Sequence, residues 1–438
     1  MGNTPLGWAA RNGQEEVVKM LLARNDIDIN KGDQERRTPL WWAAFTGHQG
    51  VVEMLLGRSG IDPNKPDMYG RTPLWVAVSD GYERVVKMLL ERDDIDPNKR
   101  DQELRTPLWW AARNGYLGIV RVLLGRGDAK PNWPDKYSES PLGIAASKGH
   151  EGVVKMLLGR DDTNPNWSGQ EYETPLWQAA CNGHQEVVKI LLSHDKTDPE
   201  MPARYGGTPL GVAASEGHEG VVKILLGRDD VNPHKPDELN QIPLWRAASN
   251  GHEGVVKALL EWDDVNTYTP DDYYLALSWA AYGGHEGLAK LLLNQDGVNP
   301  GGPGEFAKTS LWKAAQYGNH ELVKILLGQN ISPDSLDELG RTPLSLAAEN
   351  GYEEVVKLLL VRDDVNPDKP DKDGQTPLWW AARKGSQEVV RLLLKKEGVS
   401  PIKSNLFGQI PLSIAARYDH VRVVALLQPP ADAGHSAT

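Results

Sequence analysis

Hydrophobic and polar positions recur along this chain with a period of 33 or 34 residues. Each period opens with a variant of TPLxxAA, continues through an apolar-rich stretch and ends in a polar, turn-rich stretch. A fixed period of this length predicts a stack of small units, each packed only on its neighbours. Such a stack favours an extended binding surface over a central cavity. The motif begins at Thr4, Thr38, Thr72, Thr106, Ser140, Thr174, Thr208, Ile242, Leu275, Thr309, Thr342, Thr376 and Ile410.

The unit that starts at Thr342 shows which elements the pattern predicts. Thr342 is expected to cap a short first helix, and Pro343 follows where its missing N–H costs nothing. Gly351 is expected to end that helix in the left-handed conformation. The stretch EEVVKLLL at 353–360 has its apolar residues at helical spacing and predicts a second helix. The segment DDVNPDKPDKDG that follows is typical of an exposed, hairpin-like loop.

The same helix-starting and helix-ending residues recur in nearly every unit. Proline fills the second motif position in eleven of the thirteen units, and the exceptions are Ala276 and Ser310. Glycine separates the two helical stretches in twelve units, with Asp419 as the exception. We therefore expect one continuous array over residues 1–428.

These features resemble the ankyrin repeat, whose signature combines TPLHxAA, a glycine, a VVxLLL-like helix and a VNP-containing loop. The resemblance covers about residues 4–428. It implies an all-α solenoid of stacked helix-turn-helix units with hairpin-like loops. It further implies a protein–protein interaction module or scaffold that binds a protein partner through its concave face and loop tips, without catalysis. The family's histidine is replaced here by Trp, Gly or Ser, which puts its hydrogen bond to neighbouring backbone in doubt.

The ninth unit departs most from the pattern. Leu275 and Ala276 replace Thr-Pro, the preceding stretch NTYTPDDYY reads as a loop, and the following GVNPGGPGEFAK is rich in glycine. We expect a softer joint over residues 266–308. The last residues, 429–438, are expected to form a disordered tail.

Tryptophan is the first candidate for recognition chemistry, with fifteen copies against three phenylalanines. Seven occupy the position of the family's histidine, where we expect them to be wedged between repeats and to replace the lost hydrogen bond with packing area. These are Trp41, Trp75, Trp109, Trp177, Trp245, Trp312 and Trp379.

Five tryptophans lie one residue later, which turns them about 100° around the helix. The resemblance implies that this side faces the concave groove. An aromatic residue or an arginine follows each of them by three positions, so each pair can meet on one helix. Trp and Arg are frequent interface anchors, whereas the alternative is that each pair only stiffens its own helix. The candidate binding residues are Trp8 with Arg11, Trp42 with Phe45, Trp110 with Arg113, Trp279 with Tyr282, and Trp380 with Arg383. The second and third of these pairs are our first candidates.

Charge and composition narrow the remaining function classes. There are 60 acidic and 48 basic residues, a net charge of −12, which argues against nonspecific binding to nucleic acid or an anionic membrane. Cys181 is the only cysteine, so neither a disulfide framework nor a cysteine-rich zinc site is expected. We found no catalytic signature and expect neither an enzyme nor a cofactor.

Two recurring sets of potential metal ligands were also considered. A histidine follows the inter-helix glycine in six units, at His48, His150, His184, His218, His252 and His285. These lie about one repeat apart and cannot converge on one metal ion, so a structural role is expected. Acidic clusters such as Asp363, Asp364, Asp368, Asp371 and Asp373 lack a calcium-loop register and are expected to be solvated turns.

The chain carries no recognisable signal peptide at its start and no run of ~18 apolar residues. This favours a protein of the cytosol or nucleus. Its first and last units look like inner repeats, so we expect a monomer, with end-to-end association as an alternative. The first unit begins directly at its motif, and this leaves an alternative interpretation of the function. The chain would then be a sensor or autoinhibitory ankyrin arm of a larger signalling protein whose effector domain is absent from it.

Overall fold

The computed structural model describes residues 4–262, 268–295, 305–329 and 331–428. Within these ranges the chain contains thirteen helix pairs and no strand, as the sequence pattern predicts. The first helices of the pairs are α1 (Pro5–Arg11), α3 (Pro39–Thr46), α5 (Pro73–Ser79), α7 (Pro107–Asn114), α9 (Pro141–Ser147), α11 (Pro175–Cys181), α13 (Pro209–Glu216), α15 (Pro243–Asn250), α17 (Pro270–Gly283), α19 (Glu305–Gln316), α21 (Pro343–Asn350), α23 (Pro377–Lys384) and α25 (Pro411–Arg417).

The second helices run antiparallel to the first and complete each pair. They are α2 (Glu15–Leu22), α4 (Gln49–Leu56), α6 (Glu83–Leu90), α8 (Leu117–Gly125), α10 (Glu151–Leu158), α12 (Gln185–Leu192), α14 (Glu219–Leu226), α16 (Glu253–Trp262), α18 (Glu286–Leu293), α20 (His320–Leu327), α22 (Glu353–Leu360), α24 (Gln387–Lys395) and α26 (Val421–Leu427).

The predicted capping chemistry starts and stops the first helices. The Thr38 side chain accepts a hydrogen bond from the Trp41 amide at 3.1 Å, and Pro39 takes the first helical position. Gly351 closes α21 with a φ of +79°, in the left-handed region that glycine adopts without strain. In α3 and α21 the local sequence therefore supplies the caps before any packing is considered.

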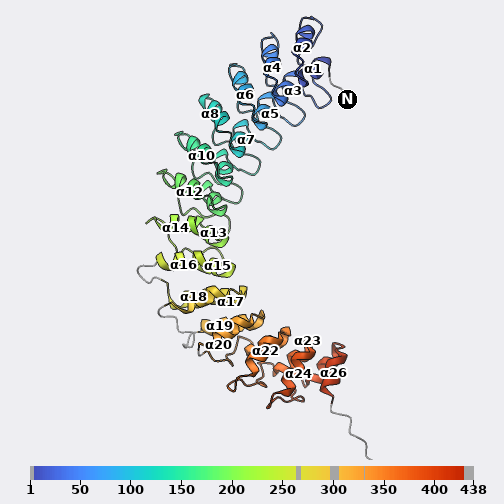
Figure 1. Ribbon diagram of the computed structural model, residues 1–438, viewed down its shortest axis with the longest axis vertical. Helices are drawn as coiled ribbons and strands as arrows, with labels where there is room; N and C mark the ends of the chain where they lie inside the picture. The colour runs from blue at the N-terminus through green and yellow to red at the C-terminus, as the bar shows by residue number, and fades with distance from the viewer. Residues whose placement is uncertain (1–3, 263–267, 296–304, 330, 429–438) are drawn as a thin grey trace, which may run out of the picture. The chain divides into compact units, whose positions relative to one another are not determined.

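The chain divides into two compact units, residues 1–241 and 242–438. In each unit first helices pack on neighbouring first helices and second helices on second helices. In the first unit, the odd-numbered helices and the long loops lie along the inner side of the curve, and the even-numbered helices lie along the outer side (Figure 1). The core between them consists of fully buried Leu and Val side chains and the small Ala-Ala pairs, such as Leu40, Ala43, Ala44, Val51 and Leu55.

Left-handed glycines between the two helices are covered by a side chain of the next repeat. At Gly115, a Cβ added to the backbone would lie 2.7 Å from Nδ1 of His150. The same ring donates from Nε2 to the Arg113 carbonyl at 2.9 Å. The expected structural role of the histidine row is confirmed at the five members whose bonds the structure shows, and His420 adds another. The bonded histidines are His48, His150, His184, His218, His285 and His420.

A ladder of asparagines joins successive loops in the first unit. The Asn30 amide donates to the Gly60 carbonyl at 2.7 Å and accepts from the Asp62 N–H at 2.8 Å. The equivalent pair of bonds recurs one repeat further on at each member of the set. The ladder consists of Asn30, Asn64, Asn98, Asn132 and Asn166.

The ninth unit departs from the sequence expectation in one respect. Residues 270–274, which read as loop, form the start of α17. Thr269 caps this helix in a reciprocal capping box with Asp272, so a Thr-Pro start lies six residues before the motif position. Likewise, residues 305–308 at the end of the glycine-rich stretch belong to α19. The softer joint at 266–308 stays a prediction, because residues 263–267 and 296–304 lie outside the described residues, as does the tail at 429–438.

Candidate protein-binding surface

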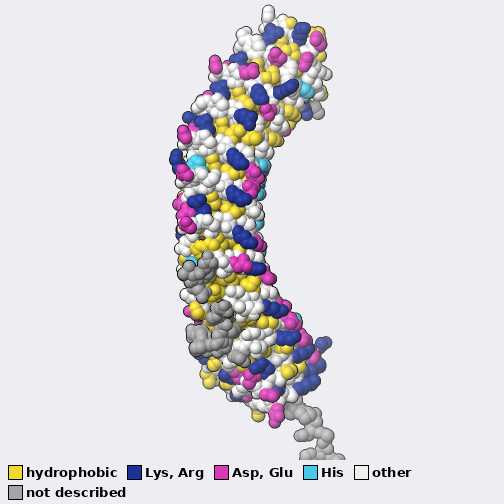
Figure 2. All heavy atoms as spheres, turned by 60° about the vertical axis from the view of Figure 1, so that its left-hand side comes forward, with side chains coloured by type: hydrophobic (Ala, Val, Ile, Leu, Met, Phe, Trp, Pro, Cys, Tyr) yellow, Lys and Arg dark blue, Asp and Glu magenta, His cyan; other side chains and the backbone are white. Residues whose placement is uncertain are grey.

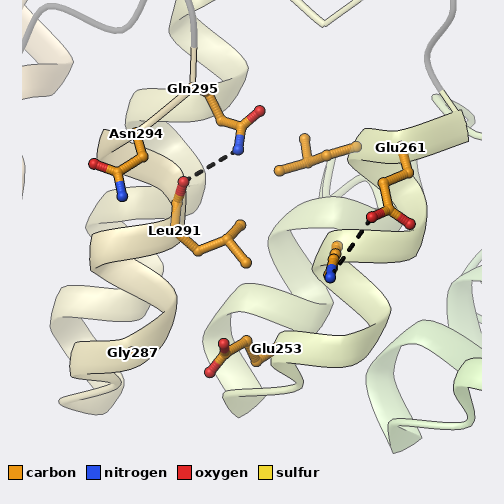
Figure 3. Close-up of a pocket in the computed structure, with 8 residues that line it drawn as sticks. Glu253, Glu261, Gly287, Leu291, Asn294 and Gln295 are labelled. Carbon is orange, nitrogen blue, oxygen red and sulfur yellow. Dashed lines mark hydrogen bonds and ion pairs between the residues drawn. The ribbon is translucent and has the colours of Figure 1, made fainter.

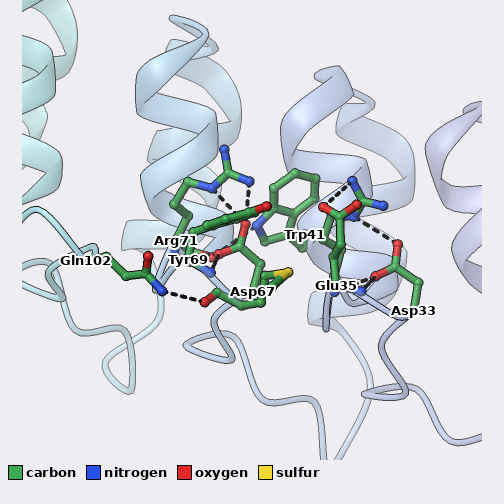
Figure 4. Close-up of polar contacts among 9 residues, drawn as sticks. Asp33, Glu35, Trp41, Asp67, Tyr69, Arg71 and Gln102 are labelled. Carbon is green, nitrogen blue, oxygen red and sulfur yellow. Dashed lines mark hydrogen bonds and ion pairs between the residues drawn. The ribbon is translucent and has the colours of Figure 1, made fainter.

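The loop before each first helix is organised by a buried aspartate. The Asp67 side chain accepts from the amides of Tyr69 and Arg71, both at 2.9 Å, and its second oxygen lies 2.7 Å from the Arg71 guanidinium (Figure 4). This carboxylate is fully buried. The same Asp-x-x-x-Arg turn forms at Asp33–Arg37, Asp101–Arg105 and Asp337–Arg341. These turns hold an arginine at the mouth of the inner face.

The expectation that the acidic clusters are solvated turns is therefore wrong in part. Asp368 is only 8 % exposed and pairs with Lys403 of the next repeat at 2.9 Å. Asp371 accepts from the amides of Asp373 and Gln375. Asp363, Asp364 and Asp373 are exposed, as expected.

The residues directly before the helix caps of repeats two to six form a column along the first unit. We call this set the inner column, and it consists of Arg37, Arg71, Arg105, Glu139 and Glu173. All five are partly buried. Sequence reasoning missed this set, although the residue directly before the motif repeats at a fixed spacing, four residues after a turn aspartate in repeats two to five and after Gly169 in repeat six, and could have identified it.

Tryptophans of the preceding repeat hold the backbone of two residues of this column. The Trp41 indole donates to the Arg71 carbonyl at 3.0 Å, and the Trp109 indole donates to the Glu139 carbonyl at 3.1 Å. The indoles of Trp177 and Trp245 donate to the carbonyls of Gly207 and Asp272 in the following repeat. The Trp312 indole donates to Ser335, at 3.0 Å to its hydroxyl and 3.3 Å to its carbonyl. The expected packing is present, but the expected loss of the hydrogen bond is wrong at these five positions, because an indole N–H replaces the imidazole. Only Trp75 and Trp379 of the seven leave their buried indole nitrogen without a hydrogen-bond partner.

This difference predicts unequal costs for one substitution at two matched sites. Trp41→Phe removes a buried hydrogen bond and is expected to lower the free energy of unfolding by about 1–2 kcal/mol. Trp75→Phe removes an N–H that has no partner, so we expect a change several times smaller. Urea unfolding of both variants under identical conditions measures the difference. Equal losses would show that the indole bond contributes nothing beyond packing.

The structure brings together four of the five predicted Trp pairs. Ring centroids are 5.9 Å apart for Trp42 and Phe45, and 6.0 Å apart for Trp279 and Tyr282. The guanidinium carbon lies over the indole at 5.2 Å for Trp110 and Arg113, and at 5.1 Å for Trp380 and Arg383.

The pair of Trp8 and Arg11 is not observed as expected. Arg11 lies instead over the ring of Trp42 in the next repeat, at 4.4 Å. Arg37 covers the same ring at 4.3 Å. Trp42 is consequently only 4 % exposed, whereas Trp8 is 55 % exposed. Trp380 is also buried, and Trp110 and Trp279 are partly exposed.

A hollow in the first unit lies between repeats three and four. It has a volume of 370 Å³. Trp75 and Trp110 meet there edge to face at 5.1 Å, and the indole nitrogens of both lack a hydrogen-bond partner. Arg105 lies over Trp110 at 4.8 Å. The lining residues are Tyr69, Arg71, Trp75, Asp101, Gln102, Glu103, Arg105 and Trp110.

The acidic half of the inner column has a different character. The Gln178 amide donates to Glu139 at 3.3 Å, while its own Oε1 is buried without a hydrogen bond. Burial, followed by repulsion from Asp135, raises the pKa of Glu139 to about 7. Burial also raises the pKa of Glu173. Loss of solvent disfavours the ionised form of both carboxylates.

The second unit has its own aromatic hollow, of 520 Å³. Trp379, Trp380, Arg383 and Tyr418 lie on its wall. The Trp380 indole donates to Asp371 at 3.0 Å, which ties that ring to a loop turn. One predicted pair, Trp380 with Arg383, therefore lines a cavity, although the tryptophan itself is largely covered.

The outer face offers less for recognition. A hollow of 460 Å³ between α16 and α18 contains an ion pair of Lys257 with Glu261 at 3.7 Å (Figure 3). Its Gln295 donates to the Leu291 carbonyl at 3.2 Å. On the side of the second helices, basic and acidic side chains are interspersed (Figure 2). No single sign of charge dominates that face.

Two searches of the described residues gave negative findings. No cluster of three or more His, Cys, Asp or Glu side chains that could hold a metal ion occurs among them. None of their helices combines the length and apolar character needed to cross a membrane.

Comparison with known proteins gives one family. A model of three consecutive ankyrin repeats matches residues 1–67, 33–101, 74–166, 142–237, 229–303, 277–371 and 361–436. Together these matches cover nearly the whole chain. A search of curated proteins returned no match.

Proposed function

Because the chain belongs to the ankyrin-repeat family, we propose that it binds a protein partner through the inner face of its first unit, without catalysis. The observation that carries the proposal is the hollow between Trp75 and Trp110. Aromatic rings and the side chains of two arginines meet there at one point of the surface. Trp and Arg are the residue types that most often dominate binding energy.

The surroundings of the hollow support a binding role. Arg71 and Arg105 are held by their turn aspartates, so little side-chain freedom is lost when a partner docks. Arg113 is exposed beside the hollow and stacks on Trp110. Trp8 and Phe45 extend the exposed aromatic surface toward the first repeat.

We assign three roles to the ten residues expected to bind, and Arg11 shares the supporting role of Trp42, whose ring it covers. Trp110, Arg113, Phe45 and Trp8 are placed to touch a partner. Trp42 is covered by Arg11, so it is proposed to support the surface from beneath. The corresponding residues of the second unit, Trp279, Tyr282, Trp380 and Arg383, are proposed as a secondary contact region.

The binding proposal predicts that two substitutions at the hollow weaken partner binding. The immobilised chain is used to capture proteins from a lysate, and the captured partner is then titrated against Trp110→Ala and Arg113→Ala by calorimetry. We expect each variant to lose about tenfold or more in affinity, because each removes an anchor at the centre of the surface.

The matched control is Trp262→Ala, which removes an exposed tryptophan at the end of an outer helix. It should leave the affinity unchanged. Before binding is measured, each variant must be shown to unfold at the same urea concentration as the wild type. A partner that binds the two hollow variants and the wild type equally would place recognition elsewhere.

A further inference from the structure

Repeats five and six of the first unit meet through two carboxyl groups and one amide. Glu139 precedes the helix cap of repeat five, Glu173 precedes that of repeat six, and Gln178 lies on α11 of repeat six. Gln178 Nε2 donates to Glu139 Oε1 at 3.3 Å, and the Gln178 side chain is also hydrogen-bonded to Glu173. All three side chains are partly buried. They form a cluster that crosses the boundary between the two repeats.

The amide of this cluster occupies space that repeat four fills with tryptophan. Gln178 takes the position of Trp110, and Gly143 takes the position of Trp109. Because Gly143 has no side chain, the amide of Gln178 lies against its backbone, and a Cβ added at Gly143 would be 3.0 Å from Gln178 Oε1. The same added atom would be 3.7 Å from Glu139 Cγ. The amide oxygen and the Glu139 side chain therefore share one small space between the repeats.

The amide oxygen lacks a hydrogen-bond donor. Gln178 Oε1 is buried and accepts no hydrogen bond in the structure, and such an acceptor lowers stability. The neighbouring Glu139 carboxyl gains a donor when it takes up a proton, because a protonated carboxyl has an O–H. That O–H can donate to the amide oxygen while the amide N–H donates to the carboxyl C=O. The pair is complete only in the protonated form.

The charges around Glu139 also favour the protonated form. Asp135, in the same loop, accepts from the Glu139 amide at 2.9 Å and repels the Glu139 carboxylate. Glu173 of the next repeat repels it as well, and of the charged groups that act on Glu139 only Lys148, directly after α9, attracts it. Burial, followed by repulsion from Asp135, raises the pKa of Glu139 to about 7. The carboxyl therefore changes its charge near neutral pH.

We propose that Glu139 and Gln178 form a pH-dependent contact between repeats five and six. Below neutrality the protonated carboxyl pairs with the amide through two hydrogen bonds and holds the repeats together. Above neutrality the carboxyl releases its proton to solvent, and the amide oxygen loses its donor. The carboxylate is then repelled by Asp135 and Glu173, and the boundary between the repeats opens more readily. This contact belongs to the fold of the first unit and does not require a binding partner.

The direction of the effect on stability follows from the pKa of Glu139. Folding raises this pKa from the ordinary 4.5 to about 7, so the folded chain holds the proton more tightly than the unfolded chain. The contribution of Glu139 to stability is therefore fully present below a pH of 4.5 and is lost as the pH rises through about 7. A carboxylate whose pKa is lowered by a basic partner shows the opposite dependence.

Glu139→Gln is the central variant, because a glutamine amide imitates the protonated carboxyl. Its N–H can donate to Gln178 Oε1, and its oxygen can accept from Gln178 Nε2, at every pH. Hydrogen exchange at residues 141–147 and 175–181 is compared between the wild type and the variant in the same buffer, so that the intrinsic effect of pH on exchange cancels. We expect these amides to exchange about tenfold faster in the wild type at about pH 8, and equally fast at about pH 5.5.

Glu173→Gln is the matched control. It removes the neighbouring carboxylate but leaves Glu139 and Gln178 in place. Because burial and Asp135 raise the pKa of Glu139 more than Glu173 does, exchange in this variant should still depend on pH.

The pKa of Glu139 provides an independent measurement. With the carboxyl carbon of glutamate isotopically labelled, an NMR titration follows the signal that is absent from Glu139→Gln. We expect a pKa of about 7 in the wild type and a lower pKa in Gln178→Met, which removes the acceptor of the acid proton but keeps an unbranched side chain. If Gln178 only donated to the carboxylate, the same substitution would raise the pKa instead.

Three results would overturn the inference. They are a pKa of Glu139 in its ordinary range, a rise of that pKa in Gln178→Met, and equal exchange of the wild type and Glu139→Gln at about pH 8. Glu139→Gln is expected to be more stable than the wild type at that pH, so a variant that unfolds more easily there would also contradict it. None of these measurements uses a binding partner, and the proposed function is tested separately.

Discussion

Replacement of Asp67 with alanine is expected to lower the free energy of unfolding by about 3–5 kcal/mol. The substitution leaves Arg71 without its buried partner at 2.7 Å. It also leaves the amides of Tyr69 and Arg71 without their acceptor. Because the carboxylate is fully buried, water cannot replace all of these bonds in the folded state. The measurement is equilibrium urea unfolding followed by tryptophan fluorescence.

The matched control is Asp94→Ala. Asp94 also pairs with an arginine at 2.7 Å, but half of its side chain is exposed. An ion pair of this kind contributes at most about 1 kcal/mol, and the change should be correspondingly small. If the two variants unfold at the same urea concentration, the buried aspartate is not what holds the loop.

The second large effect is expected at the glycine that closes α7. Gly115→Ala places a Cβ about 2.7 Å from the His150 ring, at a φ of +73°. Backbone strain and the displaced ring, with its bond to the Arg113 carbonyl, together predict a loss of about 2–4 kcal/mol. Urea unfolding gives the total, and hydrogen exchange at residues 106–125 shows whether the opening is local.

Two other glycines separate the contributions. Gly60 has a φ of +83° and open space around it, so Gly60→Ala should cost about 1 kcal/mol from strain alone. Gly125 has neither a positive φ nor a nearby atom, and Gly125→Ala should be nearly neutral. If Gly115→Ala lowered the free energy of unfolding no more than Gly60→Ala does, displacement of the histidine ring would contribute nothing to the loss.

Local rules were sufficient to predict most of the fold. Thr38 caps its helix, Pro39 opens it and Gly351 closes its own helix, as each residue's intrinsic chemistry dictates. These features involve residues a few positions apart. In the ninth unit the same rules apply, but Thr269 and Pro270 supply the start earlier than the repeat spacing indicates.

Features that depend on the next repeat were harder to predict. The pairing rule for one helix joins Trp8 to Arg11, yet Arg11 reaches Trp42 because the next helix lies within range of its long side chain. The Trp41 indole was expected only to pack, although it carries an N–H that can reach a carbonyl 30 residues later. Both depend on distances between repeats, which no periodicity supplies.

The candidate surface was predicted in part for the same reason. Trp110 and Arg113 pair as expected, since they share a helix. The arginines and glutamates of the inner column lie in loops, and in repeats two to five a buried turn aspartate binds the backbone amide of the column residue, as at Arg105 and Glu139. The change from arginine to glutamate along this column can be read from the sequence. That these side chains form one column follows only from the folded turns.

The asparagine ladder has a consequence for how such a gene can lengthen. Each rung joins one loop to the next through the same two bonds, as at Asn30 and Asn98. An in-frame duplication of one 34-residue period, such as residues 72–105, would create a rung identical to its neighbours. The asparagine of the new copy would have a backbone carbonyl to donate to and a backbone N–H to accept from in the following loop. Recombination between the units of the ladder can therefore change the length of the array while the loops of the ladder remain bonded.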